Sequence, residues 1–545
     1  MIRLTNIQLD LDHNEDELQQ AILDTLQITA KELLNFSVFK RGYDARQKNN
    51  ITLIYTLDVD TSKNDILLAQ FANNSNIKLS PDTSYKFVGK APENLSERPV
   101  VIGMGPCGLF AGLVLAQMGF KPIILERGKE VRERTKDTFG FWRKKILNTE
   151  SNVQFGEGGA GTFSDGKLYS QVKDPKHYGR KVLTEFVSAG APEEIMYVSK
   201  PHIGTFKLVT MVEQMRSTII ELGGEIRFEQ RVDDIEIIKD GEHGQVQGLT
   251  LASGETIKTN HIALAIGHSA RDTFKMLHDK QVFIKAKPFS VGFRIEHEQS
   301  VIDDARFGKN AGNPILGAAD YKLVHHCKNG RTVYSFCMCP GGTVVAAASE
   351  EGRLVTNGMS QYSRHERNAN SAIVVGISPE DFPLINGKED VLAGIELQRQ
   401  LEEKAFKLGG SDYDAPVQLV GDFLANRASG EHGEVLPSYK PGVTYCDLSH
   451  SLPSYAIDAI REALPAFDRK IKGFAKADAT LTAVETRTSS PIQITRDKDS
   501  LQSINTHGLY PAGEGAGYAG GILSAGIDGI KIAEAIAKDI LSKES

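Results

Sequence analysis

The chain has 545 residues, and its 63 Lys+Arg against 70 Asp+Glu give a formal net charge of −7. That length can bury a large core without disulfides or a structural metal, and the acidic balance disfavours a general nucleic-acid binder. Five cysteines without a C-x-x-C spacing, and an amino end without an apolar signal segment, favour a reducing compartment, so we expect a cytoplasmic protein.

Residues 1–95 are predicted to form a separate ferredoxin-like α+β module. Apolar residues alternate as in strands or recur with helical spacing, in the order β-α-β-β-α-β of a split βαβ unit. The strands are expected over residues 2–11, 36–40, 51–59 and 77–87, and the helices over 16–26 and 63–71.

A basic segment between the two middle strands carries Lys40, Arg41, Arg46 and Lys48. It could contact an anion or RNA, or it could be a solvated loop. The module has 10 basic against 13 acidic residues, which favours the solvated loop.

The rest of the chain is predicted to form one discontinuous unit with an insertion. Residues 90–99 have the polar, proline-containing character of a linker. Residues 96–280 and 475–545 share glycine-rich strand-turn-helix character, whereas 281–474 contain short alternating runs typical of a mixed sheet. We therefore expect an α/β fold, with a Rossmann-like domain interrupted by an α+β substrate domain.

The stretch 100–120 is apolar and about long enough to suggest a membrane span. Gly103, Gly105, Pro106 and Gly108 interrupt its first third, and Gln117 interrupts the rest. We therefore expect no membrane span.

The most informative motif is the G-x-G-x-x-G formed by Gly103, Gly105 and Gly108, because a strand precedes it and a helix follows it. Gly103 suits the tight turn, Gly105 lets the backbone approach a pyrophosphate, and Gly108 lets the helix pack on the strand. The amino end of the helix favours phosphate. Glu126 suits hydrogen bonds from a ribose diol and disfavours a 2′-phosphate, so FAD or NAD is expected rather than NADP.

A second glycine-rich run, F-G-E-G-G-A-G-T-F-S-D-G-K-L at residues 155–168, favours FAD over NAD, because its backbone can approach a flat ligand closely. With this run the chain resembles the family known as FAD-dependent dehydrogenases or FAD-dependent proteins, within the two-domain FAD/NAD(P)-binding flavoproteins. The resemblance covers most of the chain. It implies that the discontinuous domain binds FAD, and the absence of an attachment motif favours non-covalent binding.

Three further segments are similar to such flavoproteins. Val232 would meet the adenine through its backbone, and Gly267-His268 ends the strand by which the chain leaves the FAD domain. Glu514 would reach the ribityl–pyrophosphate region, with a longer arm than the aspartate that is common there. The residues expected to contact the cofactor are Gly103, Gly105, Pro106, Cys107, Gly108, Glu126, Arg127, Gly158, Gly159, Ala160, Gly161, Thr162, Ser164, Val232, Gly267, His268, Gly513, Glu514, Gly521 and Ile522.

The sequence lacks a second strand–G-x-G-x-x-G–helix and a redox C-x-x-C, both of which a pyridine-nucleotide–disulfide reductase would carry. If NADH or NADPH is the electron donor, it must therefore bind without a Rossmann unit of its own. The closer analogy is to fumarate reductase-like flavoproteins, in which a small-molecule substrate stacks beside the flavin.

Two pairs of residues are candidates for substrate chemistry. Asp165 and Lys167 follow the glycine-rich run directly and could line the substrate side of the flavin. Glu485 and Arg487 belong to a run similar to the family's E-T-R-T-S-S-P, near the domain junction. A pocket role and a buried structural ion pair are equally expected for them.

Four further residues are weaker candidates. Arg364 could clamp a carboxylate or lie in a solvated loop. His202 could act as a general acid, although a lone histidine is more often structural. Cys337 and Cys339, at i and i+2, are predicted on one strand face, where two small buried residues are more expected than a redox pair or a metal site. No metal site is predicted.

The sequence thus predicts an FAD-dependent oxidoreductase that carries out two-electron transfer through flavin N5 on a small molecule. One alternative is an FAD-bound sensing protein whose N-terminal module binds a partner. Another is a flavin-dependent RNA-modifying enzyme that uses the four basic residues of that module. No motif specifies the substrate or the oligomeric state.

Overall fold

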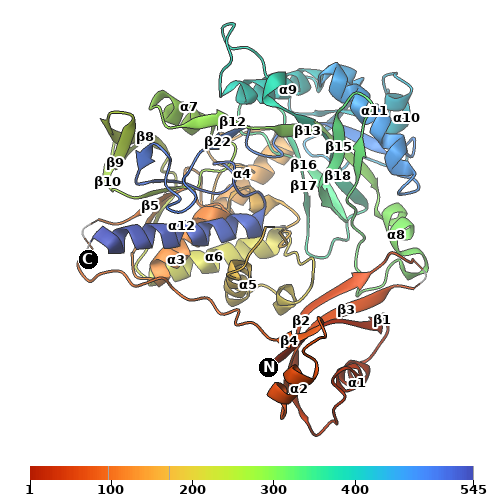
Figure 1. Cartoon of the computed structure of the whole chain (residues 1–545). Coiled ribbons are helices and arrows are strands. Elements are labelled where there is room, and N and C mark those ends of the chain that lie inside the picture. The colour runs from red at the N-terminus through yellow and green to blue at the C-terminus, as the bar shows by residue number, and fades with distance from the viewer. Residues whose placement is uncertain (49, 96, 171, 544–545) are drawn as a thin grey trace.

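The computed structural model describes residues 1–48, 50–95, 97–170 and 172–543, and it has a mixed α/β architecture with parallel and antiparallel sheets (Figure 1). Among these residues, no helix combines the length and the apolar character that crossing a membrane requires. The first eighty residues form a lobe that projects from the rest of the molecule (Figure 1).

This N-terminal lobe is a four-stranded antiparallel sheet, in the order β2–β3–β1–β4, with two helices packed on it. The predicted order β-α-β-β-α-β is found. The last strand ends at Leu79 rather than near residue 87, because Pro81 lacks the N–H that a ladder needs. The elements are β1 (Ile2–Asp10), α1 (Glu15–Leu26), β2 (Leu33–Asp44), β3 (Thr52–Thr61), α2 (Asn64–Gln70) and β4 (Ile77–Leu79).

The basic segment of the lobe is a solvated loop only in its second half, where Arg46 and Lys48 are exposed. Pairing with β3 extends β2 as far as Asp44, so Lys40 and Arg41 are strand residues. The backbone N–H of Arg41 donates to Tyr197 O at 2.6 Å, and that of Ser199 donates to Arg41 O at 2.8 Å. The lobe is therefore hydrogen-bonded to the body of the molecule through this strand.

The centre of the body is a five-stranded parallel sheet in the order β24–β11–β5–β6–β7. Four of the strands are buried throughout, as is typical of parallel sheets covered on both faces. A strand near the carboxyl end of the chain thus pairs with one near residue 262. The strands are β5 (Val100–Ile102), β6 (Ile123–Leu125), β7 (Glu225–Arg227), β11 (Ile262–Leu264) and β24 (Leu509–Pro511).

Helices cover one face of this sheet, and α3, α6 and α12 lie side by side there (Figure 1). A Cβ at Gly529 would collide with Cys107 O, so this glycine allows α12 to approach α3 closely. A smaller sheet and α7 lie on the other side. The elements are α3 (Pro106–Gln117), α4 (Val131–Lys144), α5 (Tyr178–Ser188), α6 (Thr205–Glu221), α7 (Arg271–Asp279), α12 (Ile522–Lys543), β8 (Val232–Asp240), β9 (His243–Leu251), β10 (Thr256–Lys258) and β23 (Thr506–His507).

A second large sheet has seven strands in the order β14–β15–β18–β13–β21–β19–β20. Its helices include α9, α10 and α11, which lie together at one edge of Figure 1. The elements of this part are β12 (Ile284–Ala286), β13 (Phe289–Glu298), α8 (Gln299–Phe307), β14 (Val324–His326), β15 (Thr332–Cys339), β16 (Gly342–Ala346), β17 (Thr356–Ser360), β18 (Asn368–Ile377), α9 (Ala393–Leu408), β19 (Ala415–Leu419), α10 (Val420–Leu424), β20 (Val443–Tyr445), α11 (Ser454–Asp468), β21 (Thr480–Glu485) and β22 (Ile492–Ile494).

The seven-stranded sheet continues past residue 475, where the sequence places the boundary between the two domains. Strand β21 pairs with β13 on one side and β19 on the other, so the chain stays in this sheet as far as Glu485. The pairing partners lie far away in the sequence, and the local pattern of this strand therefore gives no sign of which sheet it joins.

Candidate functional site

A cavity of about 1020 Å³ lies where the carboxyl ends of the parallel strands meet the seven-stranded sheet. Ligands of open α/β sheets bind at this edge. Most of the predicted cofactor residues line the cavity, namely Gly103, Gly105, Pro106, Cys107, Glu126, Arg127, Gly159, Ala160, Gly161, Ser164, Val232, Gly267, His268, Gly513, Glu514, Gly521 and Ile522.

The turn from β5 to α3 is built by three glycines with different tasks. Gly103 has φ 95°, and a Cβ there would collide with Ala265 O. A Cβ at Gly108 would collide with Gly103 O, so Gly108 serves helix–strand packing and does not line the cavity. Gly105 is the N-cap of α3 and supplies no side-chain cap, which leaves the first N–H groups of the helix for a ligand.

Glu126 organises the loops around this turn. Its carboxylate, which is 4% exposed, accepts hydrogen bonds from the backbone N–H groups of Met104 at 2.8 Å, Gly128 at 2.9 Å and Gly156 at 3.0 Å. A carboxylate offers about four acceptor positions. About one position is therefore left for the ribose contact that the sequence predicts.

The glycine-rich run packs directly against the β5–α3 turn. A Cβ at Gly159 would lie 2.8 Å from the Cα of Gly105, so the two glycine segments approach backbone to backbone. Gly158 has φ 85°, and a Cβ there would collide with the hydroxyl of Thr162. Gly158 and Thr162 are absent from the cavity lining and support the residues that form it.

Two other glycines leave room for a ligand. Gly267 and Gly521 have φ 68° and 83°, and a Cβ at either would meet no described atom within 4 Å. Both line the cavity, so side chains there would protrude into it. Gly521 precedes the amino end of α12, which makes this the second helix amino end at the cavity. Two such ends suit a ligand with a pyrophosphate.

Glu514 lines the cavity, and its carboxyl group makes no hydrogen bond or ion pair within the described part of the chain. Burial raises the pKa of its carboxyl to about 7, although Lys287 acts to lower that pKa, and Cys337 acts to raise it further. A carboxyl group without a protein partner suits a ligand that carries hydroxyl groups. With the open glycines and the two helix ends, it fits FAD.

The raised pKa predicts a pH effect on the stability of the FAD-free protein. Between about pH 4.5 and 7 the folded chain keeps a proton on Glu514 that the unfolded chain releases, so stability falls as the pH rises through this range. The protonated Glu514 contributes on the order of 3 kcal/mol to the free energy of unfolding at low pH, and this contribution is lost above about pH 7. Glu514→Gln should remove it, and substitution of the exposed Glu221 should not. Urea unfolding at pH 5 and 8 measures the difference, and an unchanged difference in Glu514→Gln would contradict this assignment.

Of the catalytic candidates, Lys167 and Cys337 both line the cavity and interact electrostatically with each other. The Lys167 ammonium donates a hydrogen bond to Met338 O. Burial acts to lower the pKa of Lys167, but the charges of Asp165 and Cys337 outweigh it, so the pKa lies above its usual value. The Cys339 thiol, then the charges of Arg294 and Lys167, hold the pKa of Cys337 below its usual range. These surroundings stabilise the ammonium of Lys167 and shift Cys337 toward its thiolate.

The two cysteines do not share a strand face as predicted. A bulge interrupts the pairing of β15 between Phe336 and Cys339, and Cys337 has φ 44°. Only Cys337 lines the cavity, whereas Cys339 is fully buried behind it. A non-glycine residue in the left-handed region is a conformation that clusters at functional sites.

Glu485 and Arg487 both line the cavity and both form buried ion pairs, so the two roles expected for them coincide. Glu485 accepts from Arg294 at 2.9 and 3.2 Å. Arg487 donates to Glu402 at 3.1 Å through two nitrogens. Next to this pair, burial and the charges of Arg487 and Arg271 lower the pKa of His268 to about 3, so its imidazole is neutral.

Arg364 and His202 do not line the cavity. Arg364 does bind a carboxylate, but this carboxylate belongs to Asp165 and not to a ligand. The Nε atom of Arg364 lies 2.9 Å from Oδ1 of Asp165. The Nε2 atom of His202 lies 2.9 Å from Tyr362 O, and its ring stacks on that tyrosine. Asp165 itself is buried and lines the cavity.

Several lining residues carry no signal in the sequence. Their positions depend on sheet pairings and loop contacts between distant segments. The only local hint is at Phe155, which opens the glycine-rich run and packs under the Arg127 guanidinium at 4.2 Å. The lining residues that the sequence did not indicate include Gln154, Phe155, Arg231, Ser269, Lys287, Asp320, Tyr321, Lys322, Asn357 and Tyr518.

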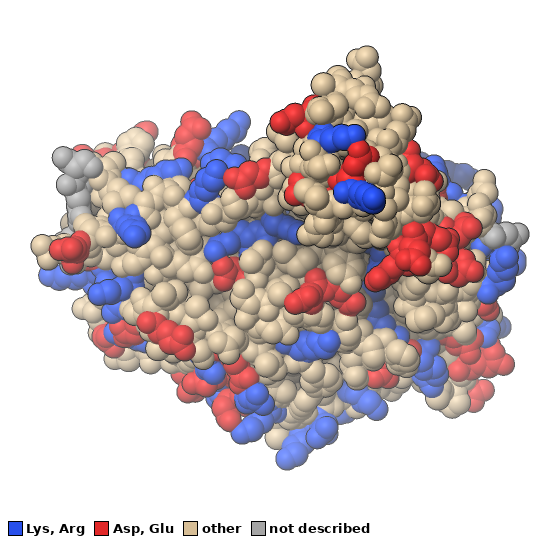
Figure 2. Space-filling view, turned by 90° about the horizontal axis from the view of Figure 1, so that it is seen from below, with Lys and Arg blue, Asp and Glu red and all other residues tan. Residues whose placement is uncertain are grey.

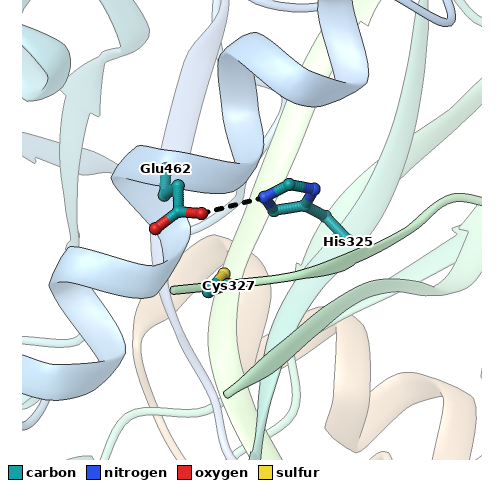
Figure 3. Close-up of side chains that lie close together, drawn as sticks. All are labelled: His325, Cys327 and Glu462. Carbon is teal, nitrogen blue, oxygen red and sulfur yellow. Dashed lines mark hydrogen bonds and ion pairs between the residues drawn. The ribbon is translucent and has the colours of Figure 1, made fainter. Parts of the chain in front are cut away.

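Outside the cavity, His325, Cys327 and Glu462 lie close together (Figure 3), with one potential metal-ligand atom from each within 4.8 Å of the others. His325 Nε2 is 3.1 Å from Glu462 Oε1. The Cys327 thiol donates to Ala459 O, and Glu462 also accepts from Lys328 N. The cluster thus joins the end of β14 to α11 and takes no part in the cavity.

Comparison with known proteins gives matches to two family models and to a relative that is similar over nearly its whole length. Residues 288–488 match the family described as "FAD-dependent protein, C-terminal domain-like", and residues 1–60 match a domain of unknown function. A protein of Clostridium beijerinckii, named only as uncharacterized, is 48% identical over 536 residues, which are 98% of each chain.

Two solved structures are similar at a much lower level. The halogenase PltM is 12% identical over 82% of this chain and 70% of its own, with a TM-score of 0.37. An L-amino acid deaminase from Proteus myxofaciens is 12% identical over 85% of this chain and 95% of its own, with a TM-score of 0.34. Similarities of this size do not indicate which reaction this chain performs.

Proposed function

The chain belongs to the FAD-dependent protein family, and we propose that it is an oxidoreductase that exchanges two electrons with a small organic molecule. One observation carries this proposal. The large cavity receives two helix amino ends, open glycines and an unpartnered carboxyl group from one part of the chain, and charged side chains from the seven-stranded sheet.

The proposal divides the chain by task. Residues 96–280 and 486–545 would form the FAD-binding domain, and 281–485 the substrate domain, with the N-terminal lobe as a third unit. This division keeps β21 in the sheet to which it is hydrogen-bonded. It also leaves the β5–α3 turn and the amino end of α12 in one domain.

The fit of the cavity residues to FAD suggests where each part of the cofactor would be held. The N–H groups at the amino end of α3 would bind the pyrophosphate, the backbone of Val232 the adenine, and Glu514 the hydroxyls of the ribityl chain. The cofactor supplies two-electron chemistry, and the protein orients the substrate and moves protons.

The wall formed by the seven-stranded sheet would contact the substrate. Lys167 places a positive charge there, which stabilises negative charge that develops during the reaction. Glu485 is fixed by Arg294, so it can orient a donor group of the substrate. Cys337 belongs to the same wall.

Lys167→Met tests this arrangement through the midpoint potential of bound FAD. Removing a buried positive charge disfavours the reduced cofactor, which carries more negative charge. At an effective dielectric constant of ~20, the loss is about 1.5–3 kcal/mol, so the potential should fall by about 30–60 mV. Reduction against a reference dye measures this shift and the number of electrons taken up per chain.

The control for this experiment is Lys173→Met, which removes an exposed charge outside the cavity lining and should leave the potential unchanged. A wild-type protein that takes up two electrons per chain supports the proposed function. A Lys167→Met protein with the wild-type potential would remove Lys167 from the redox site.

A further inference from the structure

The N-terminal lobe takes no part in the cavity described above, yet it forms a second cavity of about 250 Å³ with the body of the molecule. Ser199 and Lys200 line both cavities, so the two share a wall. The lining residues of the second cavity are Tyr43, Asp44, Ala45 and Arg46 from the lobe, and Ser199, Lys200 and Arg306 from the body.

Three hydrogen-bond donors of this second cavity have no partner among the described residues. They are the Arg306 guanidinium, the Tyr43 hydroxyl and the Ser199 hydroxyl. The Nε atom of Arg306 is also shielded from solvent. An unsatisfied buried donor destabilises the folded protein, and more so when it is charged. The site therefore favours a ligand that supplies acceptor oxygens.

The charges of the second cavity leave Arg306 in excess. Arg46 pairs with Asp44 at 2.9 Å, and Lys200 pairs with Asp320 at 2.8 Å, so these four charges compensate one another. The described residues provide no such partner for Arg306. Burial, together with Asp320, raises the pKa of Tyr43, so its hydroxyl remains a donor.

The surface around the lobe argues for a small anion rather than a polyanion. Figure 2 shows the molecule from below, the side to which the lobe projects, and its basic and acidic side chains are interspersed. A nucleic acid would favour a continuous basic surface. The unpaired positive charge lies instead in a cavity, where it can meet one anionic group.

We propose that the second cavity binds a carboxylate or phosphate group of the substrate, while the reacting part of the same molecule occupies the main cavity. This inference rests on the proposed function and names its substrate class as anionic. Arg306 would bind two oxygens of the group at once, and Tyr43 and Ser199 would add neutral hydrogen bonds. The shared wall would then set the distance from the anionic group to the reacting atoms.

Backbone hydrogen bonds connect this subsite to the main cavity. Strand β2 holds the Ser199 segment through Arg41. The residues that follow pair with the segment of Lys167, with Leu168 N 2.8 Å from Pro201 O and Ile203 N 3.1 Å from Gly166 O. The lobe therefore fixes the position of the subsite relative to Lys167, which gives the lobe a role in substrate recognition.

The test uses FAD-loaded protein, so that the cofactor's own phosphate site is filled. Inorganic phosphate and acetate are titrated separately at constant ionic strength, with phosphate followed by ³¹P line width and acetate by ¹H saturation transfer. We expect saturable binding of at least one anion, and the tighter one identifies the group. Arg306→Gln should weaken it at least tenfold and Tyr43→Phe about threefold.

The matched control is Lys309→Gln, which makes the same charge change three residues away at an exposed position outside the cavity, and should alter binding less than twofold. Binding of neither anion, or equal binding by Arg306→Gln and Lys309→Gln, would overturn the proposal. If Arg306→Gln does not fold, Tyr43→Phe tests the same cavity, because it removes only the hydroxyl group that would donate to the anion.

The outcomes for the subsite and for the proposed function can be told apart. Binding that depends on Arg306, in a protein without reducible FAD, would keep the subsite and refute the oxidoreductase. Reducible FAD without anion binding would refute only the subsite.

Discussion

Glu402→Ala is expected to lower the free energy of unfolding by about 3–5 kcal/mol, because it removes the carboxylate that pairs with buried Arg487 and the fully buried one of the two carboxylates, Glu402 and Glu350, that pair with Arg271. Glu402 has no exposed surface and accepts two hydrogen bonds each from Arg271, at 2.7 and 3.0 Å, and from Arg487, at 3.1 Å. The Thr486 hydroxyl adds a fifth bond at 2.8 Å. Urea unfolding followed by circular dichroism measures the loss.

The neighbouring Glu403 provides the control for this variant. Its carboxylate is half exposed and, among the described residues, pairs only with Lys407 one helical turn away, an arrangement that adds little stability because solvent screens it. Glu403→Ala should therefore unfold at nearly the wild-type urea concentration. If Glu402→Ala did the same, the network around Arg487 would not be what holds this cavity wall together.

Gly105→Val is expected to weaken FAD binding at least a hundredfold, which corresponds to about 2.7 kcal/mol. The reason is steric, since the side chain would occupy the space at the amino end of α3 that the pyrophosphate needs. The backbone itself tolerates a side chain, because φ is −71° and a Cβ would lie 3.7 Å from its nearest neighbour, Gly159. Titration of FAD into stripped protein measures the affinity.

Gly140→Val provides the matched control for the cofactor site. Gly140 lies in α4, outside the cavity lining, and a Cβ there meets no described atom within 4 Å. This variant should bind FAD as the wild type does. A Gly105→Val protein that purified with a full complement of FAD would place the pyrophosphate elsewhere.

Much of the candidate cofactor site could be predicted because its residues lie close together in the sequence. The strand, glycine turn, helix and second strand that position Gly103, Gly105 and Glu126 fall within about 25 residues, and hydrogen bonds between near neighbours determine them. The glycine-rich run and the Glu514 segment were also recognisable, because positive φ and close backbone approach require glycine.

The substrate side could not be predicted, because its geometry depends on distant partners. Glu485 meets an arginine 191 positions away, and Arg487 meets a glutamate 85 positions away. A strand at 480–485 joins the inserted sheet only through pairings with β13 and β19. The bulge that separates Cys337 from Cys339 is likewise a consequence of how β15 pairs with β18.

The contact between the N-terminal lobe and the body also could not be predicted, because it joins segments that are far apart in the sequence. The charge pattern of residues 40–48 is that of a solvated loop, and only the folded chain brings Arg41 to Tyr197 and Ser199. Isolated charges in a sequence do not reveal which of them remain unpaired. Arg306, which carries the proposed anion subsite, belongs to no motif.

FAD-dependent redox chemistry is best tested by an anaerobic absorption spectrum of the purified protein, recorded before and after reconstitution with FAD and then during addition of NADH, NADPH and finally dithionite. We expect a flavin spectrum with one FAD per chain that bleaches on reduction. Bleaching by NADH or NADPH would identify the electron donor, and bleaching by dithionite alone would direct the search to substrate dehydrogenation. A colourless protein that does not take up FAD would refute the assignment of the large cavity to this cofactor.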